Sequence, residues 1–116
     1  MKNLFALLLL IAVGFPAHAS YVSTYQEMRS LSTEVADTYI RGIGEGIMSG
    51  NALAAQRGAG FYCQPKNLVL DPSNYHQILM DQVQDMNTRN TPLEDVPVSL
   101  ILLLGLIRTF PCSTPN

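Results

Sequence analysis

VPVSLILLLGLIRTFPC, residues 96 to 112, is the stretch around which we expect the chain to fold. From Val98 to Ile107 all but two residues are large aliphatics, so a helix here is apolar on nearly every face and has to be buried on nearly every face. Such a helix would rise about 15 Å, roughly half the thickness of a bilayer's hydrocarbon core. Pro111 then ends it. We therefore predict a buried core helix and no membrane span.

Residues 1 to 19 have the pattern of a secretory signal peptide. Lys2 supplies the positive charge, an apolar region runs from Leu4 to Phe15, and residues 17 to 19 (AHA) form a small-residue cleavage site. We expect the protein to be exported and cleaved, which leaves one domain from Ser20 to Asn116.

Two cysteines, Cys63 and Cys112, are present in the whole sequence, and both lie in the exported part. The alternatives are two free thiols or one disulfide, and an oxidising compartment favours the disulfide. A domain of this size buries only about two-thirds of its unfolded surface. Closing a loop of about 50 residues would stabilise it by on the order of 4 kcal/mol in the chain-entropy model.

The charge of the mature domain is weakly acidic. Without the signal peptide it has six basic and nine acidic residues, a net charge of −3. No run of lysine or arginine occurs, which argues against nucleic acid or an anionic membrane as a partner. A basic protein fits this charge better.

A first helix is predicted from the capping-box pattern of residues 24 to 27 (TYQE). Apolar residues then recur at steps of three and four, as one helical stripe: Met28, Leu31, Val35, Tyr39, Ile43 and Ile47. Gly42, Gly46 and Gly50 follow at i, i+4 and i+8. We expect Tyr39, Gly42 and Gly46 to pack against another helix, because close packing would offset the helix propensity that each glycine loses. The glycines do not have the spacing of a phosphate-binding loop.

Further helices are predicted by the capping signals downstream. Asp71-Pro72 begins an amphipathic helix that ends near residues 87 to 90, and residues 91 to 94 (TPLE) repeat the capping-box spacing. Between them, residues 61 to 65 (FYCQP) read as a connector whose two aromatic rings pack beside the disulfide. No segment alternates in steps of two. The fold class is therefore an all-α domain of about four helices around the buried C-terminal helix.

Catalytic constellations are missing from the sequence. His76 is the single histidine of the mature chain, and no placed nucleophile accompanies it. No Cys/His cluster offers zinc ligands. The carboxylate pairs Asp81/Asp85 and Glu94/Asp95 lie on polar helix faces and read as solvated charge. We expect a binding protein, with no enzymatic activity, cofactor or metal.

Four motifs in this order resemble the Rap/Tai family of immunity proteins: YIRGIGEG at residues 39 to 46, FYCQP, an amphipathic helix, and an aliphatic helix closed by FPC at residues 110 to 112. The similarity covers Glu34 to Cys112. It implies a small, periplasmic, all-helical protein, often a homodimer, that neutralises a peptidoglycan amidase toxin delivered by a type VI secretion system. Many relatives carry a second cysteine pair where this chain has Asp37 and Thr38, so only the bridge from Cys63 to Cys112 carries over.

The resemblance also implies a mechanism, in which a loop or helix end of the immunity protein plugs the substrate cleft of the toxin. We expect this surface to include the most polar connections of the domain, residues 64 to 67 and 87 to 95. The partner-binding residues predicted there are Gln64, Lys66, Asn67, Arg89 and Glu94.

An alternative function is that of a periplasmic acid-stress chaperone of the HdeA type, which is also small, exported and helical. Such a chaperone opens as its carboxylates protonate, between about pH 2 and 4, and then exposes apolar surface to unfolding proteins. A titration with a hydrophobic dye separates it from an immunity protein. A third class, inhibitors of host factors such as lysozyme, has no sequence signature.

Overall fold

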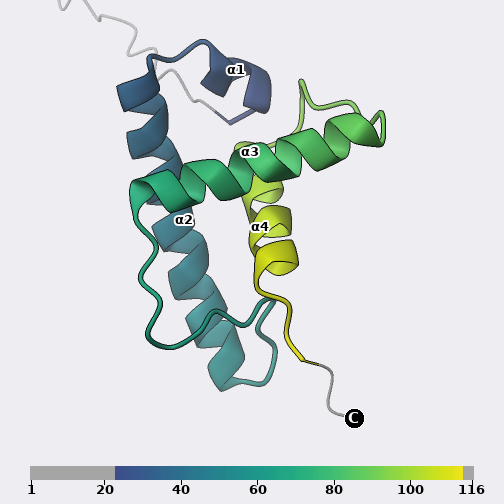
Figure 1. The fold of residues 1–116 in the computed structure, drawn as a ribbon. Helices are drawn as coiled ribbons and strands as arrows, with labels where there is room; N and C mark the ends of the chain where they lie inside the picture. The colour runs from purple at the N-terminus through teal and green to yellow at the C-terminus, as the bar shows by residue number, and fades with distance from the viewer. Residues whose placement is uncertain (1–22, 114–116) are drawn as a thin grey trace, which may run out of the picture.

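The computed structural model describes residues 23 to 113 and is all-helical, as the sequence predicts (Figure 1). Its elements are α1 (Tyr25–Arg29), α2 (Thr33–Gln56), α3 (Pro72–Thr88) and α4 (Val98–Thr109). α3 crosses in front of α2 and α4 in Figure 1 and contacts both of them, and α2 also contacts α4. The predicted signal peptide lies outside the described residues.

The chain enters α1 through the predicted capping box. Thr24 Oγ1 accepts a hydrogen bond from the backbone N–H of Glu27 (3.3 Å), and the carboxylate of Glu27 accepts one from the N–H of Thr24 (3.0 Å). The helix ends at Arg29, however, and α2 begins only after Ser32. A single continuous helix was the wrong prediction, because the Ser30 hydroxyl donates to the carbonyl of Glu27 and the Ser32 hydroxyl caps the next helix.

This break changes which face of α2 is buried. Ala36, Ile40 and Gly44 point into the core, whereas Val35, from the predicted stripe, is 52% exposed. Gly44 is the glycine that packs against a neighbouring helix: a Cβ there would lie 2.5 Å from the Tyr75 ring.

Gly42 and Gly46, which the sequence predicts to pack against another helix, meet no other helix among the described residues. A Cβ built at either position, or at Gly50, meets nothing within 4 Å. α2 turns Gly44 inward, and residues two positions away on a helix point to other sides. Tyr39, the third residue of that prediction, is partly buried against the core.

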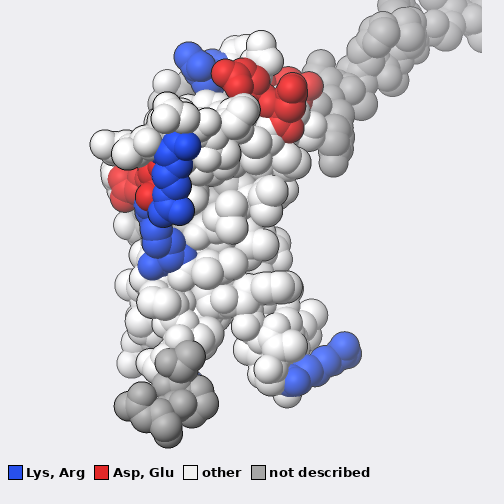
Figure 2. Space-filling view, turned by 90° about the vertical axis from the view of Figure 1, so that its right-hand side faces the viewer, with Lys and Arg blue, Asp and Glu red and all other residues white. Residues whose placement is uncertain are grey.

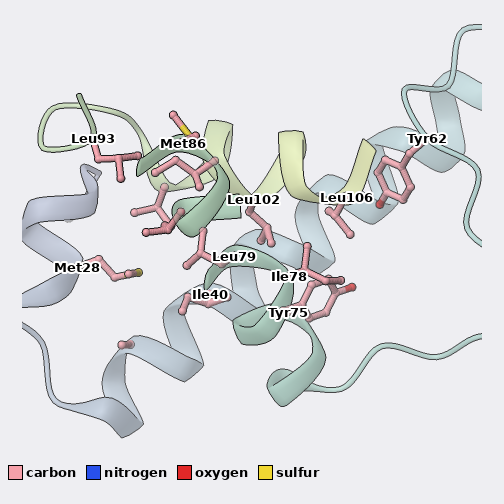
Figure 3. Packing of buried hydrophobic residues seen from close by; sticks show 14 residues of the cluster. Met28, Ile40, Tyr62, Tyr75, Ile78, Leu79, Met86, Leu93, Leu102 and Leu106 are labelled. Carbon is pink, nitrogen blue, oxygen red and sulfur yellow. The ribbon is translucent and has the colours of Figure 1, made fainter. Parts of the chain in front are cut away.

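α3 begins as predicted, at Asp71 and Pro72. The Asp71 carboxylate accepts from the N–H of Asn74, and the Asn74 side chain accepts from the N–H of Asp71, both at 2.9 Å. The buried side of α3 then supplies the centre of the core. Figure 3 shows Leu79 of α3 between Ile40 of α2 and Leu102 of α4.

α4 is buried on one side only. Val98, Ile101, Leu102 and Leu106 are fully buried. Leu100 is 45% exposed and Leu104 is 38% exposed, so the prediction of burial on nearly every face is wrong. α2 and α3 cover the inner side of α4, and no described element lies on the outer side. None of the helices in residues 23 to 113 is long and apolar enough to cross a membrane.

Candidate functional site

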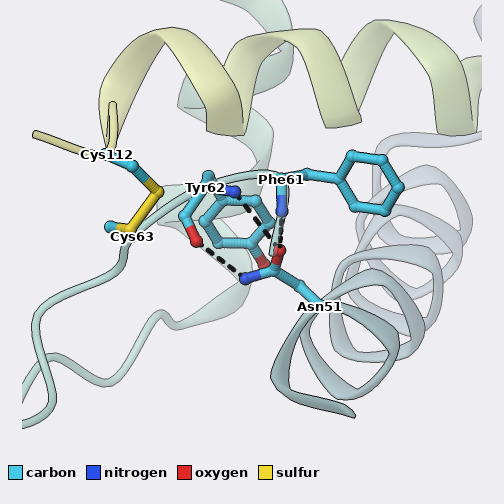
Figure 4. Close-up of a disulfide and its surroundings, with 5 residues drawn as sticks. All are labelled: Asn51, Phe61, Tyr62, Cys63 and Cys112. Atoms are coloured by element: carbon cyan, nitrogen blue, oxygen red, sulfur yellow. Dashed lines mark hydrogen bonds between the residues drawn. A yellow bond between two sulfur atoms is a disulfide. The ribbon is translucent and has the colours of Figure 1, made fainter. Parts of the chain in front are cut away.

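The predicted disulfide is present and joins the loop after α2 to the end of α4 (Figure 4). The sulfurs of Cys63 and Cys112 are 2.03 Å apart, and the bond closes a separation of 49 residues. Beside it the backbone N–H of Cys63 donates to the carbonyl of Phe110 (2.8 Å). The loop from residue 57 to 71, called the disulfide loop below, is thus held against the end of α4.

Asn51 of α2 fixes the same loop from the other side. Its Oδ1 accepts hydrogen bonds from the backbone N–H groups of Phe61 (2.6 Å) and Tyr62 (3.2 Å), and its Nδ2 donates to the carbonyl of Tyr62 (2.9 Å) (Figure 4). Sequence reasoning missed this residue. The available signal was an amide on the inward face of a helix, since a buried polar side chain requires partners.

Between α2 and the disulfide loop lies an open groove of about 420 Å³. We call it the loop groove. Its lining residues come from the second half of α2 and from the loop, and most are apolar: Met48, Asn51, Ala52, Ala55, Tyr62, Cys63, Gln64, Pro65, Lys66 and Leu68. Three large apolar side chains of the loop lie open to solvent: Phe61 is 60%, Leu68 40% and Val69 87% exposed. The prediction that both aromatic rings pack beside the disulfide is correct for Tyr62, which is buried, and wrong for Phe61.

The polar groups of the loop groove are few. Tyr62 Oη and Gln64 Oε1 are buried and have no hydrogen-bond partner among the described residues. Burial raises the pKa of the Tyr62 phenol, and burial likewise raises the pKa of the Tyr75 phenol. The Tyr75 hydroxyl lies 3.9 Å from Met48 Sδ. Lys66 forms no ion pair within residues 23 to 113. The arrangement is an apolar trough whose lining includes one lysine, and the two unpartnered oxygens are closed off from solvent.

The structure separates the predicted partner-binding residues into two groups. Gln64 and Lys66 line the loop groove, and Asn67 is exposed next to them. Glu94 lies in a second hollow, of about 520 Å³, between α1, α3 and the turn before α4. Arg89 pairs with Asp85 (3.2 Å).

The two groups lie at opposite ends of α4. The turn of Arg89 and Glu94 directly precedes Val98, the first residue of α4, whereas Cys63 of the disulfide loop is bonded to Cys112, just beyond its last residue. One compact partner surface therefore does not contain both loops without also covering α4.

His76 forms a pair with Asp37 that links α3 to α2. Nδ1 of the imidazole lies 2.6 Å from Oδ1 of the carboxylate, and both side chains are partly exposed. An imidazole and a carboxylate are two of the three groups of a hydrolytic triad. In the described part of the chain no hydroxyl or thiol bonds to this imidazole, so the pair reads as a link between helices.

Comparisons with known proteins found no relatives. A scan against protein-family models, a search of curated proteins and a search of solved structures each gave no match. The resemblance to the Rap/Tai family therefore rests on the four sequence motifs and stays a prediction.

Proposed function

We propose that this protein is a periplasmic immunity protein that binds a peptidoglycan amidase toxin of a type VI secretion system. The supporting observation is the loop groove, an apolar trough beside a disulfide loop that is fixed at both sides, that exposes apolar side chains, and whose lysine forms no ion pair within residues 23 to 113. In this proposal the disulfide loop enters the substrate cleft of the toxin and keeps peptidoglycan from its catalytic residue.

The rigidity of the disulfide loop favours such a role. A flexible loop loses conformational freedom on binding, and this costs about 0.5 to 1.5 kcal/mol per immobilised long side chain. Here the disulfide and the three hydrogen bonds of Asn51 fix the backbone at residues 61 to 63 before any partner arrives. More of the interaction energy of the contacts then appears as affinity.

The exposed side chains of the disulfide loop indicate how a partner would be held. Burying Leu68 in the groove, with Phe61 and Val69 elsewhere on the loop, stabilises a complex by roughly 25 cal/mol per Å² of apolar surface removed from water. Lys66, which forms no ion pair among the described residues, offers a positive charge to a carboxylate of the toxin and would orient the complex. An inhibitor that blocks the substrate cleft of the toxin needs no catalytic group of its own.

The first experiment is a pull-down with the purified mature domain, residues 20 to 116, against a panel of peptidoglycan amidases, followed by an assay of peptidoglycan hydrolysis. We expect one amidase to form a tight complex and to lose its activity at a molar ratio of one. Failure to bind or inhibit any amidase, including those encoded by the producing cell, would contradict the proposed function.

A second experiment locates the contact. Lys66→Ala and Leu68→Asp should each weaken amidase binding by at least about tenfold, as central interface residues do. Arg89→Ala and Glu94→Ala test the second predicted loop, at the other end of α4, and should leave affinity within about twofold if the loop groove is the contact. Equal losses in both pairs would show instead that the toxin covers both ends. Melting temperatures have to remain close to that of the parent for the comparison to count.

A further inference from the structure

The hollow between α1, α3 and the turn before α4 has no role in the proposed function. We call it the α1 hollow. It measures about 520 Å³, which falls in the range of roughly 300 to 1,000 Å³ that small-molecule sites occupy. Its lining combines charged, amide and apolar side chains from all three segments. Such a combination is typical of a site that binds a polar ligand in one orientation.

Backbone hydrogen bonds fix the walls of the α1 hollow to one another. The N–H of Tyr25 donates to the carbonyl of Val96 (3.0 Å), and the N–H of Gln26 donates to the carbonyl of Glu94 (3.3 Å). In Figure 1 α1 lies above α3, with the turn before α4 beside it. α1 has only five residues, and these bonds hold it against the turn. A ligand would therefore meet walls that are already in place, which lowers the entropy lost on binding.

Two side chains of opposite charge line the α1 hollow. The guanidinium of Arg29 lies over the Tyr25 ring, 5.8 Å from the ring centroid. Glu94 Oε2 accepts a hydrogen bond from the backbone N–H of Leu93 (3.2 Å). Arg29 and Glu94 do not pair with each other, and neither forms an ion pair elsewhere in the described part of the chain. Each side chain is thus held in place and keeps most of its hydrogen-bonding capacity for a ligand.

The rest of the lining fits the body of a peptide. Met80 of α3 is 37% exposed, and the Tyr25 ring and Leu93 also line the hollow. Methionine is flexible and adapts to side chains of different shape. The amides of Gln26 and Asn87 complete the lining, and each can both donate and accept hydrogen bonds. A peptide group likewise carries one donor and one acceptor, so these amides match it.

Figure 2 shows how charges are distributed on the side of the molecule that faces right in Figure 1. Basic and acidic side chains lie near each other at the top, the height at which α1 lies in Figure 1. Others follow the left margin and the lower right, and the broad centre is white. On α3 the charges are already paired, because Asp85 bonds to Arg89 (3.2 Å) and to Arg108 (3.4 Å). The α1 hollow thus differs in offering both signs of charge unpaired within residues 23 to 113.

We propose that the α1 hollow binds a short peptide with two free ends, whose carboxylate bonds to Arg29 and whose ammonium bonds to Glu94. A planar guanidinium binds a carboxylate through two parallel hydrogen bonds, and a carboxylate accepts strong hydrogen bonds from an ammonium. The two side chains select against a ligand that lacks either end, because one buried charge would then lose its partner.

The size of the α1 hollow indicates the length of the peptide. An extended residue spans about 3.3 to 3.6 Å, so two or three residues span roughly 7 to 11 Å. A hollow of about 520 Å³ is roughly 8 Å across when taken as a cube, which fits two or three residues. Hydrolysis of an amide bond leaves a free carboxylate and a free amine. The class of reaction that supplies such a ligand is therefore peptide hydrolysis.

The test is a calorimetric titration of residues 20 to 116 with trialanine, for which we expect a dissociation constant below about 1 mM. N-acetyl-trialanine and trialanine amide each lack one charged end and should bind at least about tenfold more weakly. Arg29→Met and Glu94→Gln should each weaken the binding of trialanine to the same extent. Arg57→Met and Asp95→Asn are the matched controls, because both residues are exposed and neither lines the hollow. The controls should bind like the parent.

Combining a variant with a modified peptide assigns each end of the ligand. If Arg29 holds the carboxylate, amidation should weaken binding to the parent and should change binding to Arg29→Met by less than about twofold. Acetylation should in the same way have little effect on Glu94→Gln.

Three results would contradict the proposal. No binding of trialanine at about 10 mM would overturn it, since a ligand of millimolar affinity nearly saturates its site there. Equal binding of the capped and free peptides would overturn the roles of Arg29 and Glu94. Free alanine that binds as tightly as trialanine would overturn the assigned length. None of these results bears on the amidase assay, because the loop groove lies at the other end of α4 and shares no lining residue with the α1 hollow.

Discussion

At the scale of single residues, Asn51 has the most partners of any polar side chain in the core. Replacing it by alanine leaves two N–H groups and one carbonyl of residues 61 and 62 without their partner in a buried setting. Each unsatisfied buried group costs about 1 to 3 kcal/mol. We expect Asn51→Ala to lower the free energy of unfolding by about 3 kcal/mol in urea titrations. Asn67→Ala, on the exposed part of the loop, is the control and should change it by less than about 0.5 kcal/mol.

The lowered pKa values of two capping carboxylates predict how the free energy of unfolding depends on pH. Backbone hydrogen bonds from Thr24 and Ser23 lower the pKa of Glu27 below its usual 4.5, and hydrogen bonds from Ser73 and Asn74 lower the pKa of Asp71 below its usual 3.8. A lowered folded-state pKa contributes stability that is complete above the usual value and is lost as the pH falls through the lowered one.

The free energy of unfolding should therefore be level from neutral pH to about pH 5 and decrease below about pH 4.5. The double variant Glu27→Gln/Asp71→Asn should be less stable than the parent at pH 7 and lose less on acidification, so that the two curves approach each other as the pH falls below the usual pKa values. Urea titrations at several pH values measure this. Curves that stay parallel throughout would exclude the two caps as the cause.

At the scale of elements, the disulfide and α4 form one unit. The bond closes a separation of 49 residues, and the chain-entropy model gives such a loop about 4 kcal/mol. Cys63→Ser/Cys112→Ser should lower the free energy of unfolding by up to this amount. Reduction of the parent chain by dithiothreitol should give the same urea midpoint as the double variant. A reduced chain as stable as the oxidised one would show that Asn51 and Phe110 hold the loop without the bond.

The helices were largely predictable, because their starts depend on local chemistry. The capping box of residues 24 to 27 and the Asp71-Pro72 pair are short patterns that act within one turn, and the structure confirms both starts. The capping-box spacing of residues 91 to 94 was a wrong prediction, because α4 begins only at Val98, after Pro97, and has no side-chain cap. The break at Ser30 to Ser32 was not predictable from periodicity, since the apolar stripe continues through it. The inward side of α2 therefore lies part of a turn away from the predicted stripe. Gly44, and not Gly42 or Gly46, lies against Tyr75.

The candidate site was predictable only in part. The sequence identified the loop around Gln64 and Lys66 because it is a polar connection between helices. The groove beside it is also lined by α2 residues whose pattern indicates only a helix: Met48, Ala52 and Ala55. The shape of a groove depends on the distance between the two segments that form it. The residue pattern within either segment does not predict that distance. The same reason explains why the sequence placed all of α4 in the core.

At the scale of the whole molecule, the position of the charges bears on the acid-stress alternative. A chaperone that opens in acid needs carboxylates at the contact that opens, so that protonation weakens it. Two carboxylates link helices in the described residues: Asp37 pairs with His76 between α2 and α3, and Asp85 pairs with Arg108 between α3 and α4. Both pairs are partly exposed, and the core between the helices is apolar. We therefore expect acid to weaken these surface links and to leave the apolar packing in place.

The loop groove lies on the side of α2 opposite its exposed glycines. The α2 residues of the groove, Met48, Ala52 and Ala55, are centred about 160° around the helix from Gly46, Gly50 and Leu53. A partner bound in the groove would therefore leave the glycine side of α2 open to solvent.

If the proposed function holds, we expect one amidase molecule per chain, bound in the loop groove. Lys66→Ala should lose amidase, whereas Leu104→Glu, on the exposed outer side of α4, should bind it with unchanged affinity. Native mass spectrometry gives the stoichiometry, and calorimetry gives the affinity. A loss of affinity in Leu104→Glu equal to that in Lys66→Ala would instead place the toxin on the outer side of α4.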